Sequence, residues 1–231
     1  MPAPISVVIP TLNTAPTLGP TLASIFAGVK AGLVREVIFA DGGSIDSLDT
    51  LADEVGAEIV TAPKGRGTQL RAGVRAAQGD WVLVVHADTI LSPDWTDAAQ
   101  THMAHFPTKA GYFRLQFDKN TWPARCTAGW ANLRSRLFGL PYGDQGLLIA
   151  QTVYVKAGGY PEIPLMEDVA LARALRGYLR PLPATATTSA QKYVAEGWLR
   201  RGWRNLTCLF LYLIGRDPAD ILKRYQTGPK S

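Results

Sequence analysis

The sequence predicts an α/β fold in which a mostly parallel β-sheet is flanked by helices. Short apolar runs rich in β-branched residues alternate with segments of helical periodicity in four successive units within the first hundred residues. This alternation is expected of βα units whose strands are buried on both faces. The length of 231 residues and the hydrophobic content of 47% suit one compact domain with an appendage.

The expected elements follow from the periodicity in chain order. The run ISVVIP at 5–10 is typical of a buried strand, and the apolar spacing of Leu18, Leu22, Ile25 and Val29 predicts a helix over 17–30. Further strands are expected at 36–40, 58–60 and 81–85, with helices at 45–55 and 68–78. Beyond Asp88 the pattern is looser. There we expect helices at 93–106, 122–138, 167–176 and 196–214, strands at 111–117 and 147–150, and Gly/Pro-rich loops within 139–166.

The net charge of +5 is concentrated at the end of the chain. Residues 192–231 hold eight basic and three acidic residues, an excess of five that equals the whole surplus. The basic residues are Lys192, Arg200, Arg201, Arg204, Arg216, Lys223, Arg224 and Lys230. A basic tail on a neutral body indicates an anionic surface or a polyanionic ligand, and it argues against a duplex-binding domain, which would carry a wider basic face.

The cysteines and the apolar runs bear on the cellular compartment. Cys126 and Cys208 lie far apart without a CxxC motif, so neither a disulfide framework nor a zinc knuckle is indicated. We expect a cytoplasmic protein without a signal peptide. The longest apolar run, 206–214, is about half of the ~20 residues that a membrane span needs.

The stretch Asp41-Gly42-Gly43-Ser44 ends the second predicted strand. A carboxylate at this position can accept hydrogen bonds from a nucleoside, the glycines allow a ligand to approach the backbone, and Ser44 can cap the next helix. A tight βα turn with an N-cap is an equally good interpretation of this stretch alone. The neighbouring strand ends favour a ligand site.

Parallel α/β sheets bind ligands at the carboxyl ends of their strands. The other predicted ends carry Pro10-Thr11-Leu12-Asn13, the basic loop 63–67, and His86-Ala87-Asp88. Side chains two residues apart on a strand point the same way, so His86 and Asp88 could share a divalent cation whose shell a diphosphate and water complete. The alternatives are a solvated loop at 63–67, and a buried histidine with a helix cap at 86–88. No G-x-G-x-x-G or P-loop motif is present.

Two adjacent carboxylates, Glu167 and Asp168, begin a predicted helix after a proline-rich turn. The helix dipole alone favours acids at such a position. In a cleft, a carboxylate can instead act as a general base that takes the proton from an attacking hydroxyl.

Together and in this order, these residues resemble the family 2 glycosyltransferases with the GT-A fold. The resemblance covers roughly residues 4–180 and rests on four segments. They are SVVIPTLN, FADGGSIDS, RAGVRAAQGDWVLVVHADT and GDQGLLIAQTVYVKAGGYPEIPLMEDVALARAL. More narrowly, H-A-D-T, G-D-Q-G and P-L-M-E-D resemble a bacterial subgroup linked with arsenosugar biosynthesis and radical-SAM neighbours.

The resemblance implies an inverting transfer of a sugar from a nucleotide-sugar, a UDP-sugar by preference, to a hydroxyl acceptor, with Mg²⁺ or Mn²⁺ as cofactor. It implies Asp168 as the catalytic base with Glu167 beside it, and Asp88 as the metal ligand. The remaining implied contacts are Pro10, Thr11, Asn13, Asp41, Gly43 and Ser44 for the nucleotide, and Gly143, Asp144 and Gln145 for sugar or acceptor.

The sequence departs from the family pattern in the donor half. His86 stands where the D-x-D motif has its first acid, which makes His86 a candidate metal ligand. An Arg-Asn pair common before Gly73 is Leu70-Arg71 here, so Arg71, or Arg66 and Gln69, would contact phosphate. The family's late metal-binding histidine has no counterpart among His86, His102 and His105. The Q-x-x-R-W motif of processive members is absent, which implies a single transfer.

We divide the chain into a GT-A domain over 1–190, with a nucleotide-binding half (1–90) and an acceptor half (91–190), and a basic amphipathic helical tail over 191–231. In the tail, Trp198, Trp203 and the arginines Arg200, Arg201 and Arg204 suggest an interfacial helix at the anionic inner membrane face. The alternative is a packed or dimer-forming helix whose stripe is Leu199, Trp203, Leu206, Phe210 and Leu213.

Two other functions share parts of this pattern. A nucleotidyltransferase would use the same nucleotide-binding half but would need no base at Asp168. A non-catalytic nucleotide-sugar-binding protein is compatible with His86 in place of an acid, although Asp41, Asp88 and Glu167-Asp168 together argue against it. We expect sugar and acceptor specificity to lie in loops within 111–146 and 183–197.

Overall fold

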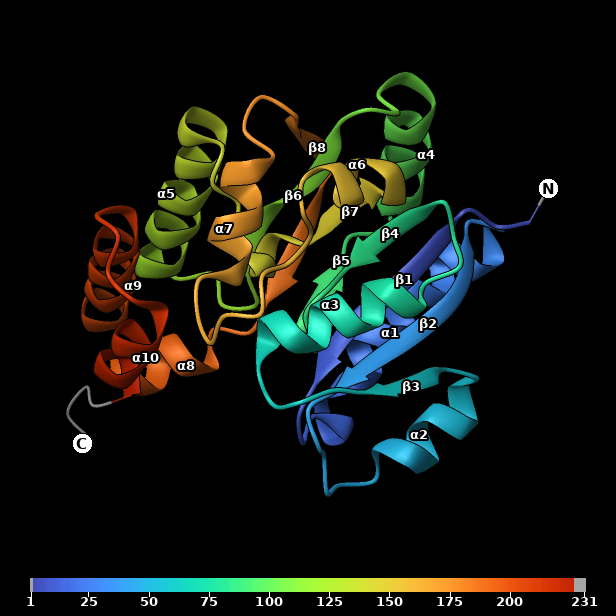
Figure 1. Ribbon diagram of the computed structural model, residues 1–231, viewed down its shortest axis with the longest axis horizontal. Coiled ribbons are helices and arrows are strands. Elements are labelled where there is room, and N and C mark those ends of the chain that lie inside the picture. Colours follow the sequence, from blue (N-terminus) through green and yellow to red (C-terminus); the bar gives the residue numbers. More distant parts are fainter. Residues whose placement is uncertain (1, 227–231) are drawn as a thin grey trace.

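The chain forms a sheet in the strand order β3-β2-β1-β4-β7-β6-β8-β5, with helices on both faces (Figure 1). The computed structural model describes residues 2–226. The strands are β1 (Ile5–Thr11), β2 (Val34–Asp41), β3 (Glu58–Thr61), β4 (Trp81–Val84), β5 (Thr89–Leu91), β6 (Ala110–Phe117), β7 (Leu147–Ala150) and β8 (Leu179–Thr188). The helices are α1 (Ala15–Lys30), α2 (Leu48–Val55), α3 (Arg66–Ala76), α4 (Trp95–His105), α5 (Trp122–Phe138), α6 (Gln151–Lys156), α7 (Glu167–Ala174), α8 (Gln191–Glu196), α9 (Trp198–Leu213) and α10 (Pro218–Gln226), with a 3₁₀ turn, η1, at Gly143–Gln145.

The first half of the sheet is parallel, as predicted. β1 lies between β2 and β4 and pairs in parallel with both, and β3 extends the sheet beyond β2. The register places Thr11 opposite Asp41, and Asp41 opposite Thr61. The carboxyl ends of these strands therefore share one edge of the sheet.

The second half of the sheet is mixed. β7 runs antiparallel to both β4 and β6, β6 runs parallel to β8, and β5 pairs antiparallel with β8. The strands β5 and β8 and the helices α6 and α10 were not predicted. The sequence pattern does not predict β8 because the strand contains Pro181 and Pro183. Proline donates no hydrogen bond to a neighbouring strand and usually marks the edge of a sheet or a break in a strand.

The helix expected over 196–214 is confirmed as α9 (Trp198–Leu213), and Gly197, whose φ is 85°, separates it from α8. The strand expected at 111–117 and the helix expected at 122–138 are likewise confirmed as β6 and α5. The expected cap of the second helix was wrong, because the helix after Asp41 begins at Leu48 and its N-cap is Ser47, not Ser44.

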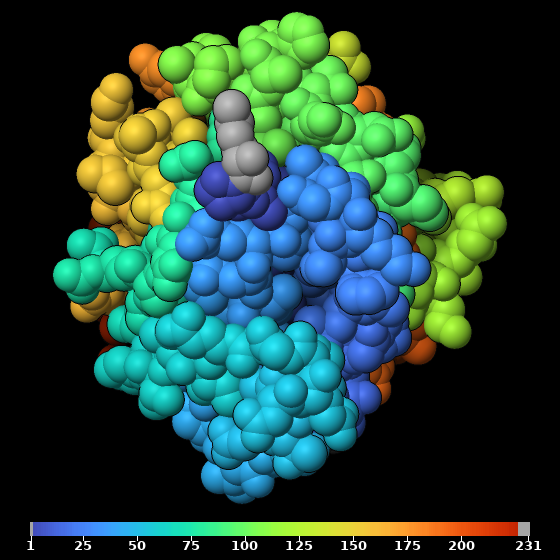
Figure 2. Space-filling model, turned by 90° about the vertical axis from the view of Figure 1, so that its right-hand side faces the viewer, coloured from blue at the N-terminus to red at the C-terminus, as the bar shows by residue number. Residues whose placement is uncertain are grey.

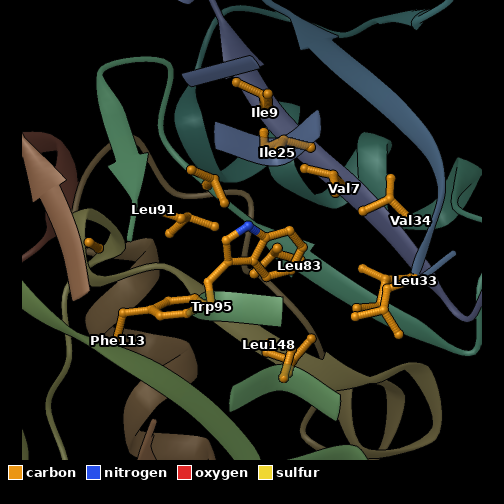
Figure 3. Packing of buried hydrophobic residues seen from close by; sticks show 14 of the residues in the cluster. Val7, Ile9, Ile25, Leu33, Val34, Leu83, Leu91, Trp95, Phe113 and Leu148 are labelled. Atoms are coloured by element: carbon orange, nitrogen blue, oxygen red, sulfur yellow. The ribbon is translucent and has the colours of Figure 1, made fainter. Parts of the chain in front are cut away.

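One face of the sheet is packed around Trp95 of α4 (Figure 3). The indole is fully buried among Val7, Leu83 and Leu148, and its Nε1 donates a hydrogen bond of 2.9 Å to the carbonyl oxygen of Ser24. A Cβ at Gly28 would lie 2.4 Å from the indole ring, so α1 approaches α4 closely only because this residue has no side chain.

The C-terminal helices share a hydrophobic cluster with the start of α7. Cys208 and Leu209 of α9 and Ile221 of α10 pack in one cluster with Met166 and Val169. Residues 191–226 are thus joined to the body by apolar contacts. The remainder of the predicted tail, 227–231, lies outside the described residues, and with it Lys230.

Figure 2 shows the end of the molecule opposite these C-terminal helices, where the first part of the chain, in blue and cyan, forms the middle and lower part of the surface, with green segments above it. Within the described residues, each helix is too short or too polar to cross a bilayer.

Candidate active site

The Asp41 carboxylate organises the loop at the end of β2. One of its oxygens accepts hydrogen bonds from the hydroxyls of Thr11 (3.0 Å) and Ser44 (2.5 Å), and the other accepts from the backbone N–H groups of Gly43 and Ser44, each at 2.8 Å. Burial raises the pKa of Asp41, but these hydrogen bonds outweigh it and hold the pKa below its usual value. Asp41 is therefore an ionised anchor of this loop.

Asn13 joins the ends of β1 and β2. Its backbone N–H donates to the Ser44 hydroxyl at 2.8 Å, and its side-chain oxygen accepts from the N–H of Ile45 at 2.9 Å. Asn13 has φ of 52°, a left-handed conformation that asparagine tolerates better than most residues. The predicted nucleotide contacts Pro10, Thr11, Asn13, Asp41, Gly43 and Ser44 thus lie together at one edge of the sheet.

Gln69 of α3 is a buried brace. Its side-chain nitrogen donates to the carbonyl oxygens of Thr11 (2.7 Å) and Ala40 (2.8 Å). Both amide protons are therefore committed to the strand ends, and the predicted phosphate contact through Gln69 has no free donor in this geometry.

Arg66 and Arg71 of α3 contact the acceptor half. The Arg66 Nε lies 3.7 Å from a carboxylate oxygen of Glu167, and Arg71 donates to the carbonyl oxygen of Tyr160 at 3.0 Å. A Cβ at Gly67 would lie 2.3 Å from the carbonyl oxygen of Pro161, so this glycine lets α3 touch the turn before α7.

His86 lies against Gly143 after the end of β4. A Cβ at Gly143 would lie 2.3 Å from His86 Nε2, which is buried without a hydrogen-bond partner among the described residues. Burial holds the pKa of His86 well below its usual range, and the charges of Arg66 and Lys192 lower it further. The imidazole is therefore neutral at physiological pH and can offer a lone pair.

Asp88 follows His86 in a turn, because β4 ends at Val84 and the N–H of Thr89 bonds the carbonyl oxygen of His86 at 3.1 Å. The expectation that His86 and Asp88 extend from one strand end is thus wrong. The charge of Asp88 acts on both Arg66 and Asp144, which places it in the same electrostatic cluster.

Asp144 in η1 is a half-buried residue whose Oδ1 atom is enclosed. Burial raises its pKa to about 6; Arg134 opposes the rise, and Asp168 and Asp88 add to it. The Arg134 guanidinium stacks 3.4 Å from the centre of the Tyr142 ring. Asp144 Oδ1 and one terminal nitrogen of Arg134 are buried without hydrogen-bond partners in the described structure.

Gln145 does not face the site, contrary to prediction. It is fully buried, its oxygen accepts from the Ser135 hydroxyl at 2.5 Å, and its nitrogen donates to the carbonyl oxygen of Phe113 at 3.1 Å. Its role is to fix η1 against α5 and β6, which orients Gly143 and Asp144.

Glu167 and Asp168 form the first turn of α7. Asp168 accepts hydrogen bonds from the N–H groups of Gly143 (2.9 Å) and Val169 (2.7 Å), so it joins α7 to η1. Burial raises the pKa of Glu167 to about 7, with a further rise from Asp168 and an opposing effect of Arg66. Met166, just before them, has φ of 70°, a strained conformation that the hydrophobic cluster around its side chain supports.

Sequence reasoning missed several neighbours of this site. Lys192 of α8 acts on His86, Tyr225 of α10 acts on Arg66, and Arg134 of α5 acts on Asp144. The sequence signals were the basic excess and the specificity loops expected within 183–197, both of which include Lys192. The positions of Tyr225 and Arg134 follow from tertiary packing, which the sequence pattern does not show. A cavity of about 20 Å³ lies beside Gly143 and Asp168, large enough for one water molecule.

The model of the family described as "Glycosyl transferase family 2" matches residues 6–138, more than half of the chain. The chain belongs to this family. The resemblance found in the sequence motifs is thereby confirmed at the level of the family, and the α/β architecture agrees with it. The match includes Asp41 and Asp88 but ends before Asp144, Glu167 and Asp168, so the roles of these three residues rest on geometry and motif.

Curated relatives match the chain over a segment. An uncharacterized glycosyltransferase of Mycobacterium bovis is 39% identical over 85 residues, 36% of each chain. Glucosyl-3-phosphoglycerate synthase of Mycolicibacterium paratuberculosis is 36% identical over 95 residues, 37% of this chain and 29% of the relative. The matches thus span about a third of the relatives' length.

Solved structures share the fold of this family 2 chain. Glucosyl-3-phosphoglycerate synthase of Mycobacterium tuberculosis, crystallised with Mn²⁺, UDP and glucosyl-3-phosphoglycerate, gives a TM-score of 0.55 at 20% identity and covers 81% of this chain and 70% of its own. S. aureus TarS gives a TM-score of 0.64 at 12% identity over 94% of this chain and 68% of its own. The TM-scores show a shared fold, and at these low identities the likeness shows the fold alone.

The contact between Gly143 and His86 leads to a prediction about stability. Gly143→Ala is expected to cost about 1–3 kcal/mol of unfolding free energy, because the new Cβ overlaps a buried ring. Combined with His86→Ala, much of this cost should disappear, giving a coupling of about 0.5–3 kcal/mol in urea unfolding. Gly129→Ala in α5, where a Cβ meets nothing within 4 Å, is the matched control and should be neutral or slightly stabilising. If the losses of unfolding free energy for Gly143→Ala and His86→Ala simply add in the double variant, the contact between the two residues is contradicted.

Proposed function

We propose that this chain transfers a single sugar, with inversion, from a UDP-sugar to a hydroxyl acceptor. The observation that carries the proposal is the convergence, in a family 2 chain, of the Asp41 loop, His86 and Asp88, η1, and the Glu167-Asp168 turn at one edge of the sheet. Donor recognition belongs to the strand ends of the first half, and the reaction to the junction of η1 with α7.

The donor end is ordered before any ligand binds, since four hydrogen bonds already fix the Asp41 carboxylate. We assign Pro10, Thr11, Asn13, Asp41, Gly43 and Ser44 to the nucleoside, with Asp41 acting through the loop that its four hydrogen bonds hold. The choice of UDP is supported by the ligands of the fold relatives, which are UDP with Mn²⁺ in glucosyl-3-phosphoglycerate synthase and UDP-GlcNAc in TarS.

A divalent cation, Mg²⁺ or Mn²⁺, fits the residues near the diphosphate. No group of three metal-ligating side chains is preassembled among the described residues, so Asp88 and the unpartnered His86 Nε2 would hold the ion together with diphosphate oxygens and water. Such an ion, when bound, stabilises the negative charge of a departing diphosphate. The cations Arg66 and Lys192, which act on His86, provide further positive charge there.

Asp168 is the proposed base. Its carboxylate takes the proton of the acceptor hydroxyl as that oxygen forms a bond to the anomeric carbon and the bond from this carbon to the diphosphate oxygen breaks. Attack from the face opposite the leaving group inverts the anomeric centre. The N–H of Gly143, 2.9 Å from Asp168, orients the carboxylate.

Narrower assignments also remain proposals. They are the division into a GT-A domain (1–190) and a tail (191–231), the cytoplasmic location, and the relation to the subgroup linked with arsenosugar biosynthesis.

Donor binding tests the proposal. In titration calorimetry with UDP-, GDP- and TDP-sugars, we expect one UDP-sugar to bind, and Mn²⁺ to strengthen its binding by about tenfold or more, a gain of about 1.4 kcal/mol. Asp88→Asn should lose this gain and keep the binding seen without metal. Binding that ignores Mn²⁺ in the wild type would remove the metal from the proposal, and no binding of any nucleotide-sugar would remove the proposal itself.

A further inference from the structure

α5 exposes an apolar stripe on the side opposite the sheet. Ala124, Ala128 and Ala131 of this helix are buried, whereas large apolar side chains on its other side are exposed. The exposed apolar side chains are Trp122, Trp130, Leu133 and Leu137, and Phe138 follows them. These tryptophans contribute nothing to the proposed reaction, and one of them, Trp122, is 71% exposed.

α9 carries a second exposed stripe. Its buried side holds Cys208 and Leu209, and its outer side consists of Leu199, Trp203, Leu206, Phe210 and Leu213, whose exposed fractions range from 41% to 91%. These five residues therefore do not pack into the core of this chain, and their use in a dimer stays a prediction. α9 does pack on the body, but through its other side.

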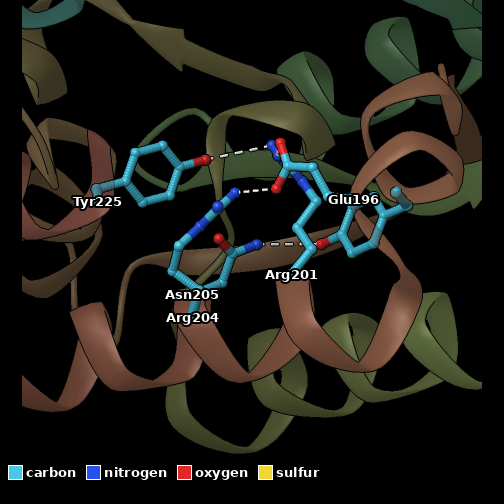
Figure 4. Close-up of polar contacts among 6 residues, drawn as sticks. Glu196, Arg201, Arg204, Asn205 and Tyr225 are labelled. Carbon is cyan, nitrogen blue, oxygen red and sulfur yellow. Dashed lines mark hydrogen bonds and ion pairs between the residues drawn. The ribbon is translucent and has the colours of Figure 1, made fainter. Parts of the chain in front are cut away.

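The arginines of α9 do not all face outward either (Figure 4). Arg201 and Arg204 both pair with Glu196, and Arg201 also donates to the Tyr225 hydroxyl at 3.2 Å. The expected use of these two arginines for lipid headgroups is thus not supported, because both guanidinium groups are held on Glu196.

The two stripes lie on neighbouring helices. α5 and α9 contact each other and lie side by side at one end of the molecule (Figure 1). Neither helix contains an aspartate or glutamate. Arg125 and Arg136 are exposed on α5, and no carboxylate of the described residues forms an ion pair with either. The combined surface, which we call the α5–α9 face, is apolar and basic.

We propose that the α5–α9 face docks on an anionic lipid surface. Helices that lie in the headgroup region of a bilayer have this composition: tryptophan, phenylalanine and leucine beside arginines, without acidic residues. A second copy of the chain is the competing occupant. A symmetric dimer would bring Arg125 and Arg136 of one copy close to those of the other, and their charges would repel. Anionic headgroups would instead neutralise these charges. The face would hold the enzyme at the membrane while leaving the chain outside the bilayer core.

Vesicle binding of the full chain, measured without nucleotide, tests this proposal independently of catalysis. The wild type is expected to co-sediment with vesicles that contain phosphatidylglycerol, more strongly than with phosphatidylcholine alone, and less strongly at high salt. Trp203→Ser/Phe210→Ser and Trp130→Ser/Leu137→Ser should each weaken partitioning by about tenfold or more, because each removes two large apolar side chains. Arg125→Glu/Arg136→Glu should remove the preference for anionic lipid.

The matched control is Phe26→Ser/Val155→Ser, which removes two apolar side chains of comparable exposure, 54% and 71%, outside this face. It should bind vesicles like the wild type. Absence of wild-type binding to anionic vesicles would overturn the proposal, as would equal losses in the control. A concentration-dependent dimer in sedimentation equilibrium, abolished by the α9 variant in a protein that ignores vesicles, would assign the face to a second copy instead.

Discussion

Asp168→Asn is expected to lower kcat by about 10²–10⁴-fold while leaving the Kd for the donor nearly unchanged. Asparagine keeps an oxygen that can accept the hydrogen bond from the Gly143 N–H, so η1 and α7 remain joined. It cannot take a proton from the acceptor hydroxyl. Turnover under saturating donor and the calorimetric Kd together separate these two effects.

Asp53→Asn is the control for this substitution. Asp53 is exposed near the end of α2, so turnover should be retained. Unchanged turnover in Asp168→Asn would exclude Asp168 as the base. Retained turnover with release of pyrophosphate would indicate a nucleotidyltransferase. Loss of donor binding would instead make Asp168 an organiser of the site through Gly143.

The parts of the site that the sequence predicted well are those in which position follows from a strand end. Asp41 ends β2, and the parallel register alone places Thr11 beside it. The same reasoning placed the basic loop before α3 and the turn at His86 near that edge. Local pattern suffices here, because each polar group comes directly after a buried apolar run.

The predictions that failed concern side chains whose direction depends on tertiary packing. Gln145 stands between Asp144 and Gly146 in a motif that suggests a ligand contact, yet it turns inward to Ser135 of α5. Gln69 likewise turns back to the strand ends. A glutamine can face either way at such a position, and the sequence does not encode which neighbours it meets. The charge of Lys192 acts on His86 only because the fold brings α8 towards the end of β4.

Glu167→Gln is expected to change how stability depends on pH. The folded-state pKa of Glu167 is about 7, above the reference value of 4.5, because burial and Asp168 disfavour its charged form. A raised pKa contributes stability that is fully present below the unfolded value and is lost as pH rises through about 7. In the wild type this group alone removes up to roughly 3 kcal/mol of unfolding free energy from about pH 5 to about pH 8. The variant lacks that loss.

Urea unfolding at a series of pH values measures the difference. Relative to wild type, Glu167→Gln should gain stability steadily from about pH 5 to about pH 8, by an amount on the order of 1–3 kcal/mol. Asp144→Asn should show a smaller gain centred at lower pH, since the pKa of Asp144 is raised to about 6. Glu54→Gln, at an exposed position of α2, is the control. If the plots of unfolding free energy against pH are parallel for Glu167→Gln and the wild type, Glu167 stays ionised throughout this range, held by Arg66.

If instead the variant gains stability and loses turnover, the buried carboxylate of Glu167 is kept for catalysis at a cost to folding, as strained active sites often require.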